Sequence, residues 1–461
     1  MEIATSYGVK IRHYNSIFIP TMQAYREAVR FFMSVCREHW DELSAISNSQ
    51  YRMRAVEKLT IRTKKNPWPA CCFSDQNERF VKFPSYLRRA AIHAAAGAVS
   101  SWKSHVQNWE KENPKTRGAR PRLCEGTAAV MPVLYHDNCY VRTGTYTARI
   151  KVYIRNTWDW LDVTLRKGDV DYIRRHFKNT AVSSPTLQRK GKEWFLRFAC
   201  IGREALSEIS VSDQKVLAVD LGVNHACVCC AMTKEGTVHG RYFLSLPEEE
   251  DSLKKALGRI GKAQRRGARR MPALWARAYG LSRDIAVKTA AFIIEKAAEQ
   301  NASVIVFEHL DVRGKKRGSR KRRLHHWRAN YVQELVTSKA HRLRMRISRV
   351  CAWNTSRLAY DGSGPVERGV GGNYSICRFT SGRIYNCDLS AAYNIGARYF
   401  TREIIKSLPE RERQRLEAKV PAAVKRSTCT LSTLYSLNAE LAACSQLSEF
   451  GVKGGKAFPA A

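Results

Sequence analysis

Three acidic residues each end a short apolar run of the sequence. Asp220 follows Val-Leu-Ala-Val, Glu308 follows Val-Ile-Val-Phe, and Asp388 follows Tyr-Asn-Cys. The chain carries 79 Lys and Arg residues against 41 Asp and Glu, so carboxylates at the ends of buried strands need a cation between them. Two divalent ions about 4 Å apart, held by carboxylates, hydrolyse phosphodiesters. Mg²⁺ takes oxygen ligands and needs no His or Cys. We therefore predict that these acids form one catalytic site with two Mg²⁺ ions.

Each acid alone has a simpler interpretation as a turn former or a helix cap. The combination is more specific, because all three follow one another along a single basic segment. Asp220 is followed by Leu-Gly-Val-Asn, Glu308 by His-Leu-Asp, and Asp388 by Leu-Ser-Ala-Ala-Tyr-Asn-Ile. Gly222 would allow a sharp turn beside the site. The nearby polar residues Asp311 and Asn394 are further candidates for a role there.

The acids need a rigid sheet to position them, and the pattern after residue 211 predicts one. Apolar runs predict strands and amphipathic spacing predicts helices. A mixed sheet with helices around it follows. The expected strands are 215–219, 226–232, 304–307 and 347–351, and the expected helices are 253–300 and 325–344.

The first half of the chain has a different pattern. Residues 3–12 are strand-like, a helix is expected to open at Ile19-Pro20, and another runs over 84–109. From 128 to 200 the periodicity changes to two, which is typical of strands. We expect an antiparallel β-barrel or sandwich here, which the first strand could join.

Length and charge restrict the class of protein. The 461 residues suffice for two or three domains, and the net charge of +38 favours a polyanionic partner. No apolar run of about 18 residues and no signal peptide are found, which disfavours a membrane. The 14 cysteines show no regular disulfide spacing and are expected to be reduced and mostly buried. Nucleic acid in the cytoplasm is the predicted partner.

The three acidic motifs resemble those of a known family. It is the RuvC-type nuclease domain of the TnpB proteins of insertion sequences and of the compact type V CRISPR effectors related to them. The resemblance covers residues 211–400, and Thr355-Ser356 adds a family-like position. It implies that Asp220, Glu308 and Asp388 are the catalytic acids.

The resemblance also implies a function. Such a protein binds a structured guide RNA, recognises a short target-adjacent motif in double-stranded DNA, and forms an RNA–DNA heteroduplex before its RuvC site cuts DNA. In such a complex, base pairing recognises the target sequence. The protein itself mainly binds the nucleic-acid backbones, which requires many lysine and arginine side chains. The expected location is the prokaryotic cytoplasm, in association with the nucleoid. Whether one or two copies act on each RNA stays open, as does the origin of the guide in a transposon or a CRISPR array.

The resulting fold class is a multidomain α+β protein. It combines an RNase H-like (RuvC) α/β domain with a β-barrel wedge domain and a helical recognition lobe. The predicted wedge domain comprises 1–14 and 118–210, the recognition domain 15–117, the RuvC-like domain 211–400 with inserted basic helices and a degenerate zinc-finger-like loop at 351–387, and a C-terminal helical or disordered tail 401–461.

Basic clusters are the candidate nucleic-acid contacts. A solvated charged face is the simpler interpretation of each cluster. The candidates are Arg88, Arg89, Arg265, Arg266, Arg269, Arg270, Lys315, Lys316, Arg317, Arg320, Lys321, Arg322 and Arg323.

The chain departs from the family in the loop before the third acid. Many relatives carry two Cys-x-x-Cys pairs there that bind zinc. This chain has Cys351, Cys377 and Cys387, which do not have that spacing. We expect the loop to bind no zinc. Ser390 also stands where the family commonly has Asn.

Three alternatives to the RNA-guided nuclease remain open. The first is an RNA-guided DNA-binding protein that represses its target without cleavage. The second is a transposon nuclease that cuts without RNA. The third is a ribonucleoprotein component with no enzymatic activity.

Overall fold

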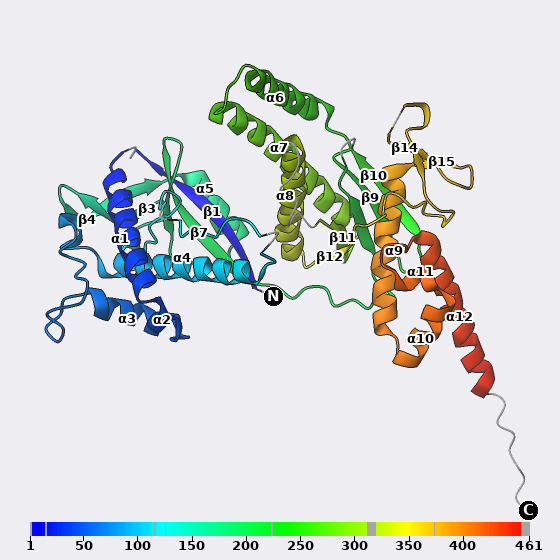
Figure 1. The fold of residues 1–461 in the computed structure, drawn as a ribbon, viewed down its shortest axis with the longest axis horizontal. Coiled ribbons are helices and arrows are strands. Elements are labelled where there is room, and N and C mark those ends of the chain that lie inside the picture. The colour runs from blue at the N-terminus through cyan, green and yellow to red at the C-terminus, as the bar shows by residue number, and fades with distance from the viewer. Residues whose placement is uncertain are drawn as a thin grey trace, which may run out of the picture. The chain divides into compact units, whose positions relative to one another are not determined.

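The computed structural model divides the chain into two compact units, 2–203 and 204–461. Figure 1 shows the helices and strands of both units. The structure describes residues 2–13, 16–114, 117–124, 126–222, 225–310, 320–372 and 374–452.

The N-terminal unit is built on an antiparallel sheet in the order β2-β3-β4-β1-β7-β5, with β6 also paired to β7. The N-terminal strand β1 pairs with β7 from Glu2↔Arg203 to Ile11↔Trp194, as the sequence suggested. The sheet curls into half a barrel, which confirms the predicted antiparallel β-rich domain in its coarser form. The strands are β1 (Glu2–Arg12), β2 (Tyr140–Arg142), β3 (Thr147–Ile154), β4 (Thr157–Leu165), β5 (Ala181–Val182), β6 (Thr186–Lys190) and β7 (Glu193–Arg203).

Helices pack on this sheet through apolar stripes. In α1, Ala24, Ala28, Phe32 and Val35 are buried at helical spacing, which gives the helix one core-facing side. Helix α5 follows β4 directly and was not predicted. The helices are α1 (Ile19–Glu38), α2 (Trp40–Ser44), α3 (Ser49–Thr60), α4 (Ser85–Lys111) and α5 (Lys167–His176), with a 3₁₀ turn η1 (Glu78–Phe80).

The C-terminal unit has a five-stranded mixed sheet in the order β10-β9-β8-β11-β12. Strand β9 pairs antiparallel with both β10 and β8, whereas β11 is parallel to both β8 and β12. Strand β10 was not predicted; its residues alternate between partly buried and exposed, but its sequence, interrupted by Gly240, does not alternate between apolar and polar. The strands are β8 (Val216–Asp220), β9 (Cys227–Met232), β10 (Val238–Leu244), β11 (Val304–His309) and β12 (Arg346–Cys351).

Helices cover both faces of this sheet (Figure 1). Val216 and Ala218 of β8 face a core shared with α9 and α12, and Leu217 and Val219 face a core shared with α7 and α8. A strand buried on both faces is apolar throughout, which made β8 easy to predict. The helices are α6 (Pro247–Arg265), α7 (Pro272–Glu299), α8 (Arg320–Arg342), α9 (Cys387–Ser407), α10 (Glu410–Lys419), α11 (Pro421–Val424) and α12 (Leu431–Val452).

The predicted zinc-finger-like loop contains a small antiparallel sheet of β13 (Glu367–Arg368), β14 (Ile376–Arg378) and β15 (Ile384–Asn386). Its apolar centre includes Cys377, Phe379 and Cys387. This packing gives the segment a core of protein side chains.

The segment treated as a tail is joined closely to the C-terminal unit. The predicted boundary at 400/401 lies inside α9, and Leu431, Leu434 and Leu437 of α12 are buried in the core beneath the sheet. Residues 453–461, the last part of that prediction, lie outside the described residues. Within the described part of the chain, no helix is both long enough and apolar enough to span a bilayer.

Candidate active site

Two of the three acids lie at the carboxyl ends of neighbouring parallel strands. Asp220 is the last residue of β8, and Glu308 is the next-to-last residue of β11. Val219 is paired with Phe307 in the sheet register. The acids that follow these two residues therefore lie at the same level, on strands about 4.8 Å apart. The sheet itself thus brings Asp220 beside Glu308.

The third acid comes from a helix over the turn that follows β8. Asp388 is in the first turn of α9, which is capped by the Asn386 side chain accepting from the Leu389 amide at 2.9 Å. A Cβ atom placed on Gly222 would lie 3.5 Å from Asp388 Oδ2 and 3.0 Å from the carbonyl of His225. Because Gly222 has no side chain, Asp388 can lie close to the turn that follows β8.

The electrostatics show that the three acids share one environment. Burial raises the pKa of Asp220 well above its ordinary value, and the charges of Glu308 and then Asp388 raise it further. Burial also raises the pKa of Glu308 and the pKa of Asp388. Like charges held together away from water disfavour ionisation. The structure therefore places Asp220 within the field of both other acids.

The donor set fits a divalent cation chemically. Asp388 Oδ2 is buried and has no hydrogen-bond partner among the described residues, an arrangement that costs free energy unless something occupies the oxygen. Buried carboxylate oxygens are the ligands that Mg²⁺ prefers. As the side chains lie here, no group of three or more His, Cys, Asp or Glu among the described residues is arranged to hold one metal ion. The fit thus rests on donor chemistry, and the Mg²⁺ assignment stays a prediction.

Thr355 and Gln333 orient Glu308. The Thr355 hydroxyl donates a hydrogen bond to Glu308 Oε1, which lowers the pKa of Glu308 against the larger effect of burial. The Gln333 amide donates to the Glu308 backbone carbonyl at 3.0 Å. These contacts fix both the side chain and the strand end.

Arg398 links two chain segments near Glu308 by hydrogen bonds to their backbone carbonyls. This buried guanidinium donates to the carbonyls of Cys351 at 2.6 Å, Trp353 at 2.8 Å, Cys429 at 3.0 Å and Ser427 at 3.1 Å. Its charge also lowers the pKa of Glu308. Arg398 therefore ties the end of β12 to the segment before α12 and favours the ionised form of Glu308.

Asn394, a candidate for a direct role, makes structural contacts instead. Its amide donates to the carbonyls of Thr355 and Leu358, both at 2.9 Å, and its oxygen accepts from the Leu431 amide at 3.2 Å. Ser390 likewise accepts from the Tyr360 amide at 3.2 Å. These side chains position the segment that carries Thr355. Asp311 lies outside the described residues.

Two basic residues without a predicted role lie near the acids. Arg368 of β13 lowers the pKa of Asp220 and of Asp388, and its guanidinium donates to the Ser356 carbonyl at 2.8 Å. His225, just after the turn, also lowers the pKa of Asp388 and lies 2.8 Å from Ser245 through Nδ1. The small β13–β15 sheet therefore places a cation beside the acids.

The basic clusters differ in their surroundings. Arg88 and Arg89 both donate to Glu57 Oε1, at 3.2 and 3.1 Å, and the Arg88 side chain is only 17% exposed. The expected solvated face is therefore wrong for Arg88, because Glu57 of α3 covers and pairs it. Glu57 therefore occupies one donor nitrogen of each guanidinium group, whereas the Arg89 side chain is still 37% exposed.

For the other basic clusters, contact with nucleic acid stays a prediction. Those at the end of α6 and in the turn before α7 are all exposed: Arg265, Arg266, Arg269 and Arg270. Lys315, Lys316 and Arg317 lie outside the described residues. The backbone of Arg320, Lys321, Arg322 and Arg323 forms the start of α8, whereas their side chains are outside the described part.

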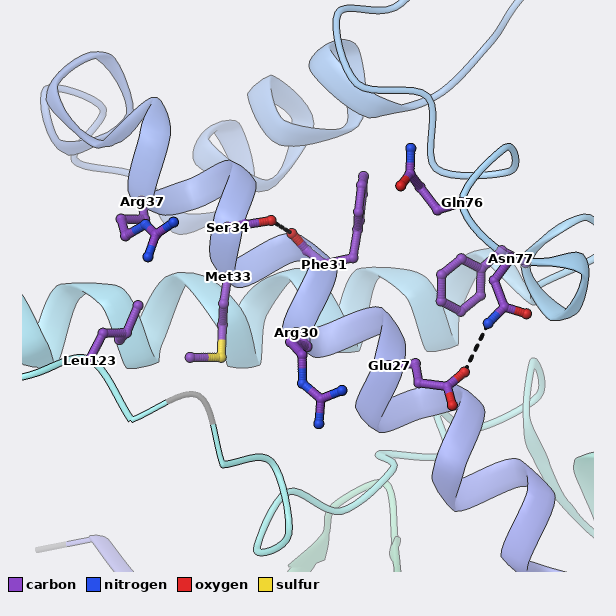
Figure 2. Close-up of a pocket in the computed structure, with 10 residues that line it drawn as sticks. Glu27, Arg30, Phe31, Met33, Ser34, Arg37, Gln76, Asn77 and Leu123 are labelled. Atoms are coloured by element: carbon purple, nitrogen blue, oxygen red, sulfur yellow. Dashed lines mark hydrogen bonds between the residues drawn. The ribbon is translucent and has the colours of Figure 1, made fainter.

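A separate hollow of about 430 Å³ lies on α1 in the N-terminal unit (Figure 2). Arg30 and Arg37 project along it, and Asn77 donates to Glu27 at 3.0 Å at its other end. It contains none of the three acids. The hollow is therefore no part of the candidate active site.

Two cysteines of the predicted degenerate zinc loop, Cys377 and Cys387, are neighbours in one small core. Cys377 and Cys387 are buried in the small sheet, and burial together with the neighbouring Cys387 thiol raises the pKa of Cys377 to about 12. Cys377 Sγ also lies 3.4 Å from the Tyr385 carbonyl. Cys351 ends β12, where its carbonyl accepts from Arg398. Zinc ligation requires thiolates, which this burial disfavours.

We expect the purified protein to contain less than stoichiometric zinc, with no change in the Cys377→Ser variant. Elemental analysis of both proteins after dialysis measures this. The exposed Cys124 provides a matched Cys124→Ser control. One zinc per chain that is lost only in Cys377→Ser would overturn the expectation.

One protein-family profile matches part of the chain. The sequence profile of the Aq_aa04 family matches residues 5–154, which is less than half of the chain. No curated protein matches the sequence.

Several solved structures are similar at low identity. One is a Cas12f1–sgRNA–target DNA complex, with 14% identity and a TM-score of 0.31 over 85% of this chain and 98% of that chain. A second is C2c1 of Alicyclobacillus acidoterrestris with single-guide RNA, with 10% identity and a TM-score of 0.42 over 82% of this chain and 65% of that chain. A third is CasPhi-2 (Cas12j) bound to crRNA, with 10% identity and a TM-score of 0.32 over 85% and 97% of the two chains.

Proposed function

We propose that the protein is an RNA-guided, Mg²⁺-dependent DNA endonuclease of the kind represented by TnpB proteins and compact type V CRISPR effectors. The observation that carries the proposal is the meeting of Asp220, Glu308 and Asp388 at one edge of the mixed sheet, where two charges raise the pKa of Asp220. The strand order β10-β9-β8-β11-β12, with its change from antiparallel to parallel at β8, supports an RNase H-like domain.

The chain's own residues prepare the site for phosphodiester hydrolysis. Two Mg²⁺ ions, when bound by the three acids, stabilise the attacking and leaving oxygens of the phosphate and activate a water molecule. Asp220 would be the central ligand of these ions, because it lies within the electrostatic field of both other acids. Thr355 occupies one oxygen of Glu308 and thereby orients the carboxylate.

The cations around the acids hold the substrate and maintain the charge state. Arg398 favours the ionised form of Glu308 from within the core. Arg368 lies at the exposed edge of the site, where its guanidinium can pair with the DNA phosphate to be cut.

The charge of the whole chain supports nucleic-acid partners. A net charge of +38 favours binding to phosphate backbones through release of their counterions. Guide RNA and target double-stranded DNA are the proposed partners, in the prokaryotic cytoplasm at the nucleoid. In such a complex, base pairing selects the sequence and the protein contacts backbones and the short target-adjacent motif.

We expect the protein purified with its co-purifying RNA to cut a DNA carrying the complementary target and the adjacent motif, and to stop cutting after nuclease removal of the RNA. Adding back transcribed RNA is expected to restore cleavage. Sequencing the RNA identifies the target and assigns its origin to a transposon end or a CRISPR array.

Each other result supports an alternative. Cleavage that persists without RNA supports a protein-only nuclease. Target binding without cleavage in Mg²⁺ supports a repressor-like protein. If the protein neither binds nor cleaves the matched target, an RNA-guided function is contradicted.

A further inference from the structure

A small apolar cavity lies in the curled sheet of the N-terminal unit. It measures about 160 Å³ and is lined by residues of five strands and of α5, among them Val9, Leu165 and Val170. An apolar cavity of about 150 Å³ is large enough to bind benzene. The cavity therefore has room for one six-membered ring.

The cavity has aromatic walls. The rings of Tyr140 and Phe198 lie edge to face with centroids 5.7 Å apart, and His136 lies edge to face with Tyr140 at 5.2 Å. Tyr140 and Phe198 are buried, so their packing holds them in place. Preorganised aromatic walls suit a flat ring, because stacking needs no sequence-specific hydrogen bond.

The cavity adjoins a basic hollow. A wider hollow of about 860 Å³ shares Arg142, Ile173 and Val182 with the cavity. Arg174, Arg175 and Lys178 line this hollow together with Arg142, and Asp171 is its one acid among the lining residues. Asp171 itself accepts a hydrogen bond from Tyr146 at 3.0 Å. The mouth of the cavity thus carries an excess of positive charge.

Stabilisation of the α5 dipole explains only part of this charge. Arg174 and Arg175 belong to the last turn of α5, where cations are favourable. Lys178 lies beyond the helix, and Arg142 comes from β2. The Arg142 guanidinium is held by the carbonyls of Gly144 at 3.2 Å and Thr145 at 2.6 Å, next to the cavity. Strand and helix therefore direct cations to the same place.

We infer that this cavity, which we call the aromatic pocket, binds one unpaired base of a single-stranded nucleic acid. The basic hollow then holds the flanking phosphates. A flat ring between two phosphates combines the apolar, aromatic and anionic features that the two adjoining spaces require. The base must be unpaired, because a base in a duplex has both faces covered. This inference goes beyond the proposed cleavage function and involves none of its acids.

The test measures binding of short oligonucleotides to the full-length, RNA-free protein by fluorescence anisotropy at fixed salt. The probes are oligo(U) and oligo(dT) of about eight nucleotides and an abasic strand of equal length. We expect at least one base-containing strand to bind about tenfold more tightly than the abasic strand, since one stacked base contributes about that factor. The tighter of oligo(U) and oligo(dT) identifies RNA or DNA as the source of the base.

Two variants separate the pocket from general charge effects. Val182 lines both spaces and is 41% exposed, so Val182→Asp places a negative charge at the mouth without opening the core. We expect it to weaken binding of the preferred strand about tenfold. The matched control is Val81→Asp, at a residue 65% exposed elsewhere in the unit, which is expected to change binding less than twofold.

A second pair of variants tests the basic hollow. The triple change Arg174→Ala, Arg175→Ala and Lys178→Ala is expected to weaken binding and to reduce its salt dependence. The control removes the same charge from exposed residues of α3 and the segment after it: Arg54→Ala, Lys64→Ala and Lys65→Ala.

Three results would overturn the inference. One is equal affinity for base-containing and abasic strands, which would mean phosphate contact alone. Another is an equal effect of Val182→Asp and Val81→Asp. The third is tighter binding of an oligo-glutamate peptide than of either oligonucleotide, which would favour a protein partner. Failure of target cleavage leaves these binding results unaffected, so the two proposals are tested separately.

Discussion

Replacement of Asp220 by alanine is expected to reduce guided DNA cleavage by about a thousandfold or more. Asp220 lies between the charges of Glu308 and Asp388, so its loss removes the central ligand of the proposed site. Metal-assisted stabilisation of the reacting oxygens contributes several kcal/mol, and about 1.4 kcal/mol corresponds to a factor of ten in rate. Single-turnover cleavage of a matched target by the variant ribonucleoprotein measures the effect.

RNA and DNA binding by the Asp220→Ala variant should change little, because the proposed contacts to backbones come from lysine and arginine. Asp251→Asn is the matched control, at an exposed acid on α6 of the same unit. That control is expected to cleave at the wild-type rate. Cleavage by Asp220→Ala at a rate close to that of the control would remove the proposed site, whereas loss of target binding would show that Asp220 has a structural role.

The position of the acids in the fold could be predicted from sequence because the strands that carry them are buried on both faces. Such strands are continuous apolar runs, and Asp220 and Glu308 interrupt them at their ends. Asp388 was harder to place, because it belongs to a helix and not to a strand. Its approach to Asp220 depends on Gly222, which the sequence marks only as a turn.

The residues that support the acids could not be predicted in the same way. Arg398 makes its four hydrogen bonds to backbone carbonyls. Every residue type has such a carbonyl, so the sequence does not indicate which residues accept these hydrogen bonds. Thr355 reaches Glu308 across 47 positions of the chain, and Arg368 comes from a separate small sheet. These contacts follow from tertiary packing.

Local composition also misjudged the charged helix α4 and the end of the chain. The Arg88-Arg89 pair suggested a solvated face, but Glu57 is brought to it from another helix. The residues after 400 were predicted as a helical or disordered tail; the described ones form helices, but α12 also contributes three leucines to the core. In both cases the partner is distant in sequence, so helical periodicity alone could not identify it.

Replacement of Asp220 by asparagine is expected to stabilise the metal-free protein at neutral pH. Burial and two neighbouring charges raise the pKa of Asp220 in the folded protein above its value in the unfolded chain. The folded state therefore binds a proton more tightly, and this contribution to stability is complete below the unfolded pKa of about 3.9. It is lost as the pH rises through the folded pKa. Asparagine carries no charge at any of these pH values.

The free energy of unfolding, measured with urea in EDTA, should be higher for Asp220→Asn than for wild type at pH 7 by at least about 1 kcal/mol, since each pKa unit corresponds to about 1.4 kcal/mol. The difference should shrink toward pH 4. Mg²⁺ should reverse the order, because an ion that binds only the folded wild type stabilises it by about 2.7 kcal/mol at a hundred times its Kd. Asp251→Asn should follow wild type throughout. Equal Mg²⁺ stabilisation of wild type and Asp220→Asn would place the ion elsewhere, and a less stable Asp220→Asn in EDTA would mean that Asp220 is paired in the fold rather than held among like charges.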